Sequence, residues 1–411
     1  MWLRIFYRLR QTWVRVALWK RAVAIGIGLC LLIQLAFGLS LWREAQFRQQ
    51  LAGRARLYLG KSPLSLNVQA SLGRFTSSER LQLLVPVEAV SIVQPTDDDF
   101  RSISGLNIKR LTIRFRDLGA RELQHIGWVS QLEALELDCD TVDEQGLAPL
   151  ADCRKLRSLK ILGRLAPEAL SPLQRCVSLS KLHVSVMSVF ATDSKGSLDS
   201  ITRSHLVAAA QIPNLKCLTL HSPGINISVL GGLAGAQRLE ELYLYKVDLH
   251  QVHPQDGSLN GLSQLPRLRL LSLSVDPSYY VEPLEGFPAL STLALHGARI
   301  SPQFLASLRR LPHLGTLSFT KCFVNDSLSA LAKNSKLKRL NLMSTDADVE
   351  GVRRIGRLYS LEVLRIPGFQ DGEEFRDLFP RLQSPSAFDW GFVMDQEVVM
   401  FGAPLGGGGM F

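Results

Sequence analysis

One six-residue pattern, apolar-x-x-apolar-x-apolar, recurs along most of this chain and constrains its fold more than any other feature. Eleven copies begin at positions that are mostly 22 to 24 residues apart, with two longer steps of 36 and 29 residues. They start at Ile108, Leu132, Leu156, Leu179, Leu215, Leu239, Leu268, Leu290, Leu314, Leu337 and Leu361. A weaker twelfth copy at residues 87–92 precedes them. Self-similarity at such a period predicts an array of stacked units.

Each copy predicts a short strand, followed by a turn and a helical return along the other face. Further apolar residues usually stand nine, six and three positions before a copy, as Leu147, Leu150 and Cys153 do before Leu156. One such unit has only half of a core, which its neighbours in the stack complete. We therefore expect an α/β solenoid with a parallel sheet on the concave face and short helices on the convex face.

These units resemble leucine-rich repeats, in particular the bacterial type of about 24 residues that reads x-V-T-D-x-G-L-x-x-L. Residues 141–150, TVDEQGLAPL, come closest to that pattern. The resemblance covers residues 108–383 and implies a right-handed leucine-rich repeat solenoid, but it says almost nothing about function. The chain departs from the family eight positions after each start, where Asn is usual and Asp140, Asp276 or Cys322 stands here.

The N-terminal region predicts a membrane anchor. Residues 22–42 form an uncharged stretch of 21 residues, which as a helix is about 30 Å long, the thickness of a bilayer's hydrocarbon core. Trp19 and Trp42 bracket it, at the level where aromatic rings favour the headgroups. A cleaved signal peptide and a buried core helix are the alternatives. However, the stretch exceeds the roughly 7 to 15 apolar residues of a signal peptide, and no clear A-x-A-like site follows it.

The distribution of charge agrees with a membrane anchor and argues against a nucleic-acid partner. Residues 1–61 contain 11 bases and one acid, Glu44. Subtracting these from the totals of 47 bases and 37 acids leaves 36 of each in the other 350 residues, so the net charge of +10 belongs to the N-terminal region. The bases before the apolar stretch predict a cytoplasmic N-terminus, with the repeat domain on the non-cytoplasmic side.

The chain thus divides into six expected parts. They are a basic aromatic juxtamembrane segment (1–21), a transmembrane helix (22–42), a partly helical linker (43–84), an N-terminal cap or weak first repeat (85–107), about eleven leucine-rich repeats (108–383), and a C-terminal cap with a Gly-rich tail (384–411). In the last part, Phe388, Trp390 and Phe392 are expected to cover the open core of the final repeat.

The concave face should consist of the third, fifth and seventh residues of each copy, because side chains alternate between the two faces of a strand. On this face we expect a protein partner to contact Glu241, Tyr243, Tyr245, His183, His221, His296, Arg339 and Arg365. Tyr243 and Tyr245 are the strongest candidates, because tyrosine offers a large contact area and a polar group at little entropic cost. Ordinary exposed strand tyrosines are the alternative.

The sequence contains none of the common catalytic motifs, such as a GxxxxGK[ST] loop, a GxSxG elbow or an HExxH helix. One spacing suits zinc, at Asp248, His250, His253 and Asp256, but proline and glycine in the same segment favour a solvated loop. Five cysteines outside the apolar stretch imply no disulfide framework, and most of them are expected to be small buried residues. We expect no cofactor, no metal and no enzymatic activity.

Together these observations predict a single-pass membrane protein whose leucine-rich repeats form a scaffold that binds another protein through the concave face. A structural envelope or membrane protein without a specific ligand is the alternative. A metal-dependent hydrolase that uses the 248–256 loop is a third hypothesis from a different class.

Overall fold

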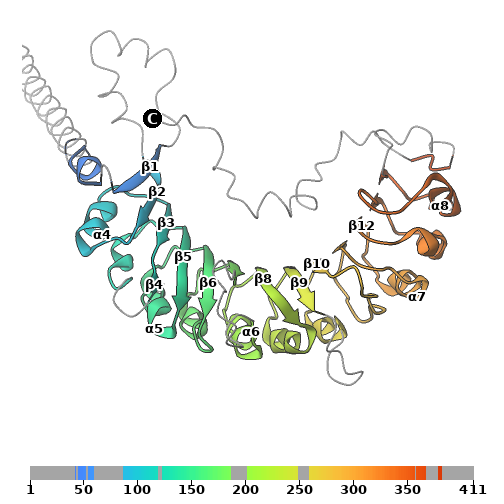
Figure 1. Ribbon diagram of the computed structural model, residues 1–411, viewed down its shortest axis with the longest axis horizontal. Coiled ribbons are helices and arrows are strands. Elements are labelled where there is room, and N and C mark those ends of the chain that lie inside the picture. Colours follow the sequence, from blue (N-terminus) through green and yellow to red (C-terminus); the bar gives the residue numbers. More distant parts are fainter. Residues whose placement is uncertain are drawn as a thin grey trace, which may run out of the picture.

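The computed structural model describes residues 42, 45–51, 54–59, 87–118, 123–186, 201–248, 259–356, 358–366 and 378–381. Fourteen strands in these residues form one continuous sheet, which curves into an arc with the strands inside and the helices outside (Figure 1). The strand order follows the chain from β1 to β14, except that the short β4 pairs with β5 beside this path. The predicted solenoid with a parallel sheet is confirmed.

The repeated six-residue pattern, which we call the frame, predicts where the strands of this sheet lie. Even the weak copy at residues 87–92 forms a strand, β2, whose Val90 and Ile92 align with Leu111 and Ile113 of β3. The strands are β1 (Ala55–Leu59), β2 (Val87–Val93), β3 (Arg110–Arg114), β4 (Asp117–Leu118), β5 (Ala134–Val142), β6 (Ser158–Leu165), β7 (Lys181–Ser185), β8 (Cys217–Asn226), β9 (Glu241–Asp248), β10 (Leu270–Val275), β11 (Thr292–His296), β12 (Thr316–Thr320), β13 (Arg339–Asn341) and β14 (Val363–Arg365).

The core lies between the sheet and the outer helices and runs along the whole arc. It contains the first, fourth and sixth residues of each copy; Leu156, Leu159 and Ile161, for example, have no exposed surface. Burying one such side chain stabilises the fold by about 2 kcal/mol. Four cysteines, Cys139, Cys153, Cys176 and Cys322, are buried, Cys217 is half-buried, and none of these five forms a disulfide. The expectation of small buried cysteines is thus confirmed for four of them.

Short helices, many of them 3₁₀, return the chain along the convex side. Asp143 and Asp348 each begin one by accepting a hydrogen bond of 2.7 Å from the backbone N–H of a glycine three residues on. The helices are α4 (Asp97–Ser104), η1 (Ile126–Trp128), α5 (Glu144–Leu147), η2 (Ala148–Asp152), η3 (Ser171–Arg175), α6 (Arg203–Ala210), η4 (Ile227–Gly235), η5 (Leu259–Gln264), α7 (Pro302–Ser307), η6 (Leu308–Arg310), η7 (Asn325–Lys333) and α8 (Val349–Arg354).

Both ends of the core are covered by elements that the frame does not predict. At the N-terminal end, β1 pairs antiparallel with β2. Next to β1, Arg54 forms an ion pair of 2.9 Å with the buried Asp99 of α4. At the C-terminal end, Phe379 has no exposed surface and belongs to the same core. Without such caps, the first and last repeats would expose an apolar face.

Several expectations fall outside the described residues. These include the transmembrane stretch except Trp42 and the C-terminal part 384–411. Residues 187–200 and 249–258, which lie in the two longer steps of the repeat and include three of the four zinc-like residues, also fall outside. Among the residues that are described, no helix has the length and apolar character needed to cross a membrane.

Candidate protein-binding face

Nine concave-face side chains at the middle of the sheet form a three-by-three grid on β7, β8 and β9. Parallel pairing aligns them in three rows, which are Lys181, Cys217 and Glu241; His183, Thr219 and Tyr243; and Ser185, His221 and Tyr245. Neighbouring strands are about 4.8 Å apart, so side chains in one row are in contact distance. We call this grid the tyrosine–histidine patch; it contains five of the eight predicted site residues.

Tyr243 and Tyr245 stand side by side along β9, and both are half-buried. The hydroxyl of Tyr243 lies 3.5 Å from Oε2 of Glu241, a long and therefore weak hydrogen bond. Burial and, for Tyr243, the negative charge of Glu241 raise the pKa of both phenols. The two tyrosines are therefore neutral at physiological pH, and each offers a hydroxyl group that can donate a hydrogen bond to a partner.

His221 joins the tyrosines to the neighbouring strand. Its Nδ1 lies 3.0 Å from the hydroxyl oxygen of Ser185, and its ring meets the Tyr245 ring edge-to-face with 5.8 Å between centroids. The side chain is buried, and among the described residues no group forms a hydrogen bond with its Nε2. Burial and the nearby Lys246 lower the pKa of His221, so the ring is neutral at pH 7.

His183 lies at the β7 end of the middle row, beside Thr219. Burial, followed by the charge of Lys160 and the proximity of His221, lowers the pKa of His183 to about 4. Burial also raises the pKa of the Cys217 thiol to about 12, which keeps it protonated. Within the described part of the chain, no group of three or more His, Cys, Asp or Glu side chains is arranged to hold a metal ion.

The other three predicted residues do not belong to the patch. His296 ends β11, two strands beyond β9, where it aligns with Ser274 and Thr320. Arg339 is on β13 and Arg365 on β14, four and five strands beyond β9. The structure therefore separates the eight residues into a central group of five and a C-terminal group of three.

The N-terminal part of the concave face carries charged side chains that pair with one another across the strands. Arg114 Nε lies 2.6 Å from Asp138 Oδ2, and Lys160 Nζ lies 2.8 Å from Glu136 Oε1. A third pair at the edge joins Arg110 and Glu88 at 3.4 Å. Because these charges neutralise one another, this part presents a polar surface with little net charge.

The C-terminal part, on β10 to β14, carries mostly small neutral side chains. Its central row consists of Ser272, Ala294, Ser318 and Asn341, all buried, followed by Arg365. Asn341 donates a hydrogen bond of 2.9 Å from Nδ2 to the hydroxyl of Ser318. The central row of this half therefore consists of short, buried side chains up to Asn341.

Thr219 and Ser185 are part of the patch although their residue types do not single them out in the sequence. Both occupy concave positions of the frame, so their place on the face follows from the repeat. Their neighbours follow only from the pairing of β7 with β8 across the 36-residue step, which aligns Ser185 with His221.

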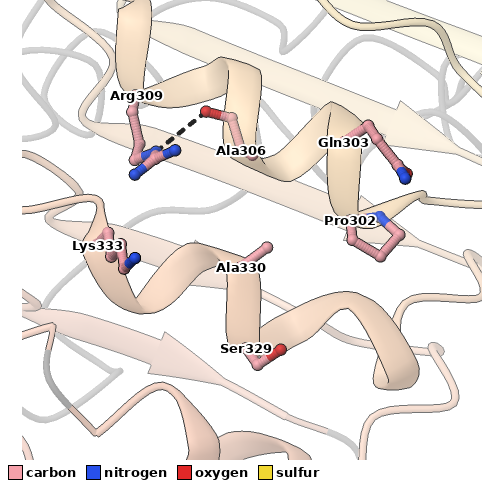
Figure 2. A pocket seen from close by; sticks show the side chains of 7 residues that line it. All are labelled: Pro302, Gln303, Ala306, Arg309, Ser329, Ala330 and Lys333. Carbon is pink, nitrogen blue, oxygen red and sulfur yellow. Dashed lines mark hydrogen bonds between the residues drawn. The ribbon is translucent and has the colours of Figure 1, made fainter.

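The convex side carries a shallow groove of about 370 Å³ between the helices of two successive repeats (Figure 2). Pro302, Gln303, Ala306 and Arg309 line one side, and Ser329, Ala330 and Lys333 line the other. Arg309 Nε donates a hydrogen bond to the carbonyl of Ala306. Apart from the bases Arg309 and Lys333, the described lining residues are neutral.

Comparisons with known proteins give no sequence match but several similar structures. No protein-family model matches the chain, and no curated protein matches it. An internalin from Listeria monocytogenes is 15% identical, with a TM-score of 0.41, and the match covers 76% of this chain and 83% of the internalin. A leucine-rich repeat protein from Leptospira interrogans is 16% identical, with a TM-score of 0.35 and coverages of 79% and 93%.

The fold is that of a leucine-rich repeat solenoid. Two observations establish it. The six-residue pattern recurs in eleven copies, and the strands pair in parallel so that equivalent positions of successive copies lie side by side. One strand per repeat and a convex return of short helices complete the architecture.

Proposed function

We propose that this protein is a scaffold that binds another protein through the tyrosine–histidine patch, without catalysis. The observation that carries the proposal is the grid itself, in which two neutral tyrosines, neutral histidines and Glu241 come together on the concave sheet face. Half-buried tyrosines combine a large apolar surface with a polar end, the composition typical of energetically dominant interface residues. A rigid sheet also orders them before binding, which reduces the entropic cost.

We further propose that residues 22–42 anchor the scaffold in a membrane, with the repeats on the non-cytoplasmic side. The support is the sequence, namely the uncharged stretch of 21 residues and the bases before it. Carbonate extraction of native membranes should leave the chain in the pellet. Added protease should digest the repeats from the non-cytoplasmic side only. Release by carbonate would contradict the anchor and leave the binding proposal standing.

Proximity labelling of the full chain in its native membrane tests the binding proposal. The double variant Tyr243→Ala/Tyr245→Ala should lose a specific labelled protein, because removing a dominant interface residue costs at least about 2 kcal/mol, or roughly 30-fold in affinity. The chosen control is Tyr280→Ala, since Tyr280 is 62% exposed and lies outside the concave rows.

Three outcomes are distinguishable. Loss of a labelled protein in the double variant but not in Tyr280→Ala supports the patch. Equal labelling by both variants and the unchanged chain removes the patch as the binding site. The absence of any specifically labelled protein would favour a structural envelope or membrane protein without a ligand.

A further inference from the structure

The convex groove between α7 and η7 combines two small apolar side chains with two bases at one end. Figure 2 shows Arg309 and Lys333 at the same end of the groove, one from each side. Ala306 and Ala330 line its middle and are half-buried. Longer side chains at these two positions would fill the groove, so the alanines keep its space of about 370 Å³ open.

The positive charge of this groove is not neutralised by the described part of the chain. Arg309 and Lys333 are both exposed, and no described carboxylate forms an ion pair with either. The neighbouring Arg310 differs, because it pairs with Glu285. Asp326, the acid of η7, precedes Lys333 by seven residues, or about 14 Å along a 3₁₀ helix. The two bases are therefore accessible to an external anion.

Arg309 is oriented by its own helix. Its Nε donates a hydrogen bond of 3.2 Å to the carbonyl of Ala306, three residues before it. A guanidinium has further N–H donors, and its fork-like geometry matches the two oxygens of a carboxylate. The hydrogen bond to Ala306 thus positions Arg309 for a carboxylate before any ligand arrives.

A second convex groove, of about 440 Å³, lies between η3 and α6 and shows which of these features are specific. Its charged lining residues are one acid, Glu168, and one base, Arg203, so their charges cancel. Grooves between convex helices thus recur in this fold, but the positive end distinguishes the groove between α7 and η7.

We propose that the groove between α7 and η7 binds an acidic peptide segment of a partner protein. Two carboxylates of the segment would pair with Arg309 and Lys333, and its backbone would lie over Ala306 and Ala330. A shallow groove does not enclose a small molecule, which binding pockets usually bury by about 70 to 90%. Two bases are also too few for a nucleic acid, whose binding typically uses about 6 to 10 phosphate contacts. This convex site is separate from the tyrosine–histidine patch and goes beyond the proposed function.

Carbodiimide coupling of a peptide to the purified full chain tests the proposal, because it joins a carboxylate to an amine only where the two are in contact. The probe is a peptide of alternating alanine and glutamate, acetylated and amidated at its ends. Peptide mapping should find it on Lys333 about threefold or more as often as on Lys336, since an exposed ion pair adds up to about 1 kcal/mol. Lys336 is an exposed lysine outside the groove. Equal labelling of the two lysines would overturn the proposal.

Charge reversal in the two grooves provides matched variants. Arg309→Glu should lower the coupling at Lys333 about tenfold, because it replaces an attraction for the probe by a repulsion. Arg203→Glu makes the same change in the second groove and should leave the coupling at Lys333 as it is. Both arginines are exposed, so neither substitution should prevent folding. An undiminished coupling in Arg309→Glu would refute the proposal.

Competition identifies the class of ligand. A peptide of alternating alanine and glutamine should not compete with the probe. Single-stranded DNA that suppressed the coupling at a lower concentration than unlabelled acidic peptide would show a preference for nucleic acid and contradict the proposal. The variant Tyr243→Ala/Tyr245→Ala should couple as the unchanged chain does, so this experiment and the test of the patch can fail separately.

Discussion

The two halves of the concave face have the same core beneath them but different surfaces. In the N-terminal half, long charged side chains such as Lys160 and Glu136 pair across neighbouring strands. In the C-terminal half, the equivalent row is reduced to Ser272, Ala294 and Ser318. The tyrosine–histidine patch lies between them. The frame thus determines only the buried positions, so the intervening positions can differ between repeats without altering the fold.

The largest expected effect tests whether the two halves share an equivalent core. Leu137→Ala in β5 and Leu317→Ala in β12 each remove a side chain that has no exposed surface. Each should lower the free energy of unfolding by about 2 to 5 kcal/mol, because the substitution removes buried apolar atoms and leaves a cavity in their place. Denaturant unfolding of both variants measures this. If only one of the two variants lowered the free energy of unfolding by less than about 1 kcal/mol, the two halves would not share an equivalent core.

The second-largest expected effect is a loss of folding stability in acid, caused by His183 on the N-terminal side of the patch. The pKa of His183 is about 4 in the fold, below the value of 6.5 for a free imidazole. The unfolded chain therefore binds the proton first, and stability should fall as the pH drops from about 6.5 to 4, by up to about 3 kcal/mol. Above pH 6.5 this contribution is constant.

The variant His183→Gln, which cannot titrate, provides the control for acid sensitivity. Its free energy of unfolding, measured between pH 7 and pH 4, should decline less than that of the unchanged chain. The remaining decline would come from other groups, including His221, whose pKa is also lowered. Identical pH profiles for the two proteins would show that His183 is not responsible.

A third, smaller effect tests the C-terminal half. In this half, Asn341 and Ser318 are fully buried and joined by a hydrogen bond, and Asn341 Oδ1 accepts a hydrogen bond of 3.1 Å from the Met343 N–H. Asn341→Ala should cost about 1 to 3 kcal/mol of stability, because it leaves these groups without a partner. Ser318→Ala, which removes one partner only, should cost less. The reverse order would contradict this account of the buried Asn341–Ser318 pair.

The smallest effect tests the ion pairs of the N-terminal half. A double-mutant cycle with Glu136→Gln and Lys160→Gln should give a coupling energy of about 0.2 to 1 kcal/mol, because both side chains are about a third exposed. The coupling should decrease at about 1 M salt, where screening is strong. A coupling well above this range would mean that these pairs stabilise the N-terminal half to an extent that the C-terminal half lacks.

Sequence alone could predict the repeat strands because their pattern is local. The apolar spacing at Leu156, Leu159 and Ile161 identifies a strand and its buried face within six residues. The antiparallel β1 could not be predicted in this way, because a single strand outside the array has no repeated spacing. Its position depends on long-range contacts, including the ion pair between Arg54 and Asp99.

The candidate site was predictable in part for the same reason. Tyr243 and Glu241 share one strand, so their proximity follows from the sequence. The concave positions of the pattern also include His296 and Arg365, but these lie two and five strands away from β9. The contact between Ser185 and His221 depends on how β7 and β8 align, and these strands are 36 residues apart in the sequence. No local pattern predicts that alignment.

Because each repeat contributes one strand, the repeats also divide the concave face into equal steps. Each repeat advances the concave face by one strand spacing, about 4.8 Å. Gaining or losing one repeat between β9 and β13 would therefore shift Arg339 relative to Tyr243 by that step and leave the chemistry of both residues unchanged. In such a protein, the number of repeats between two surface features is itself a determinant of which partner fits.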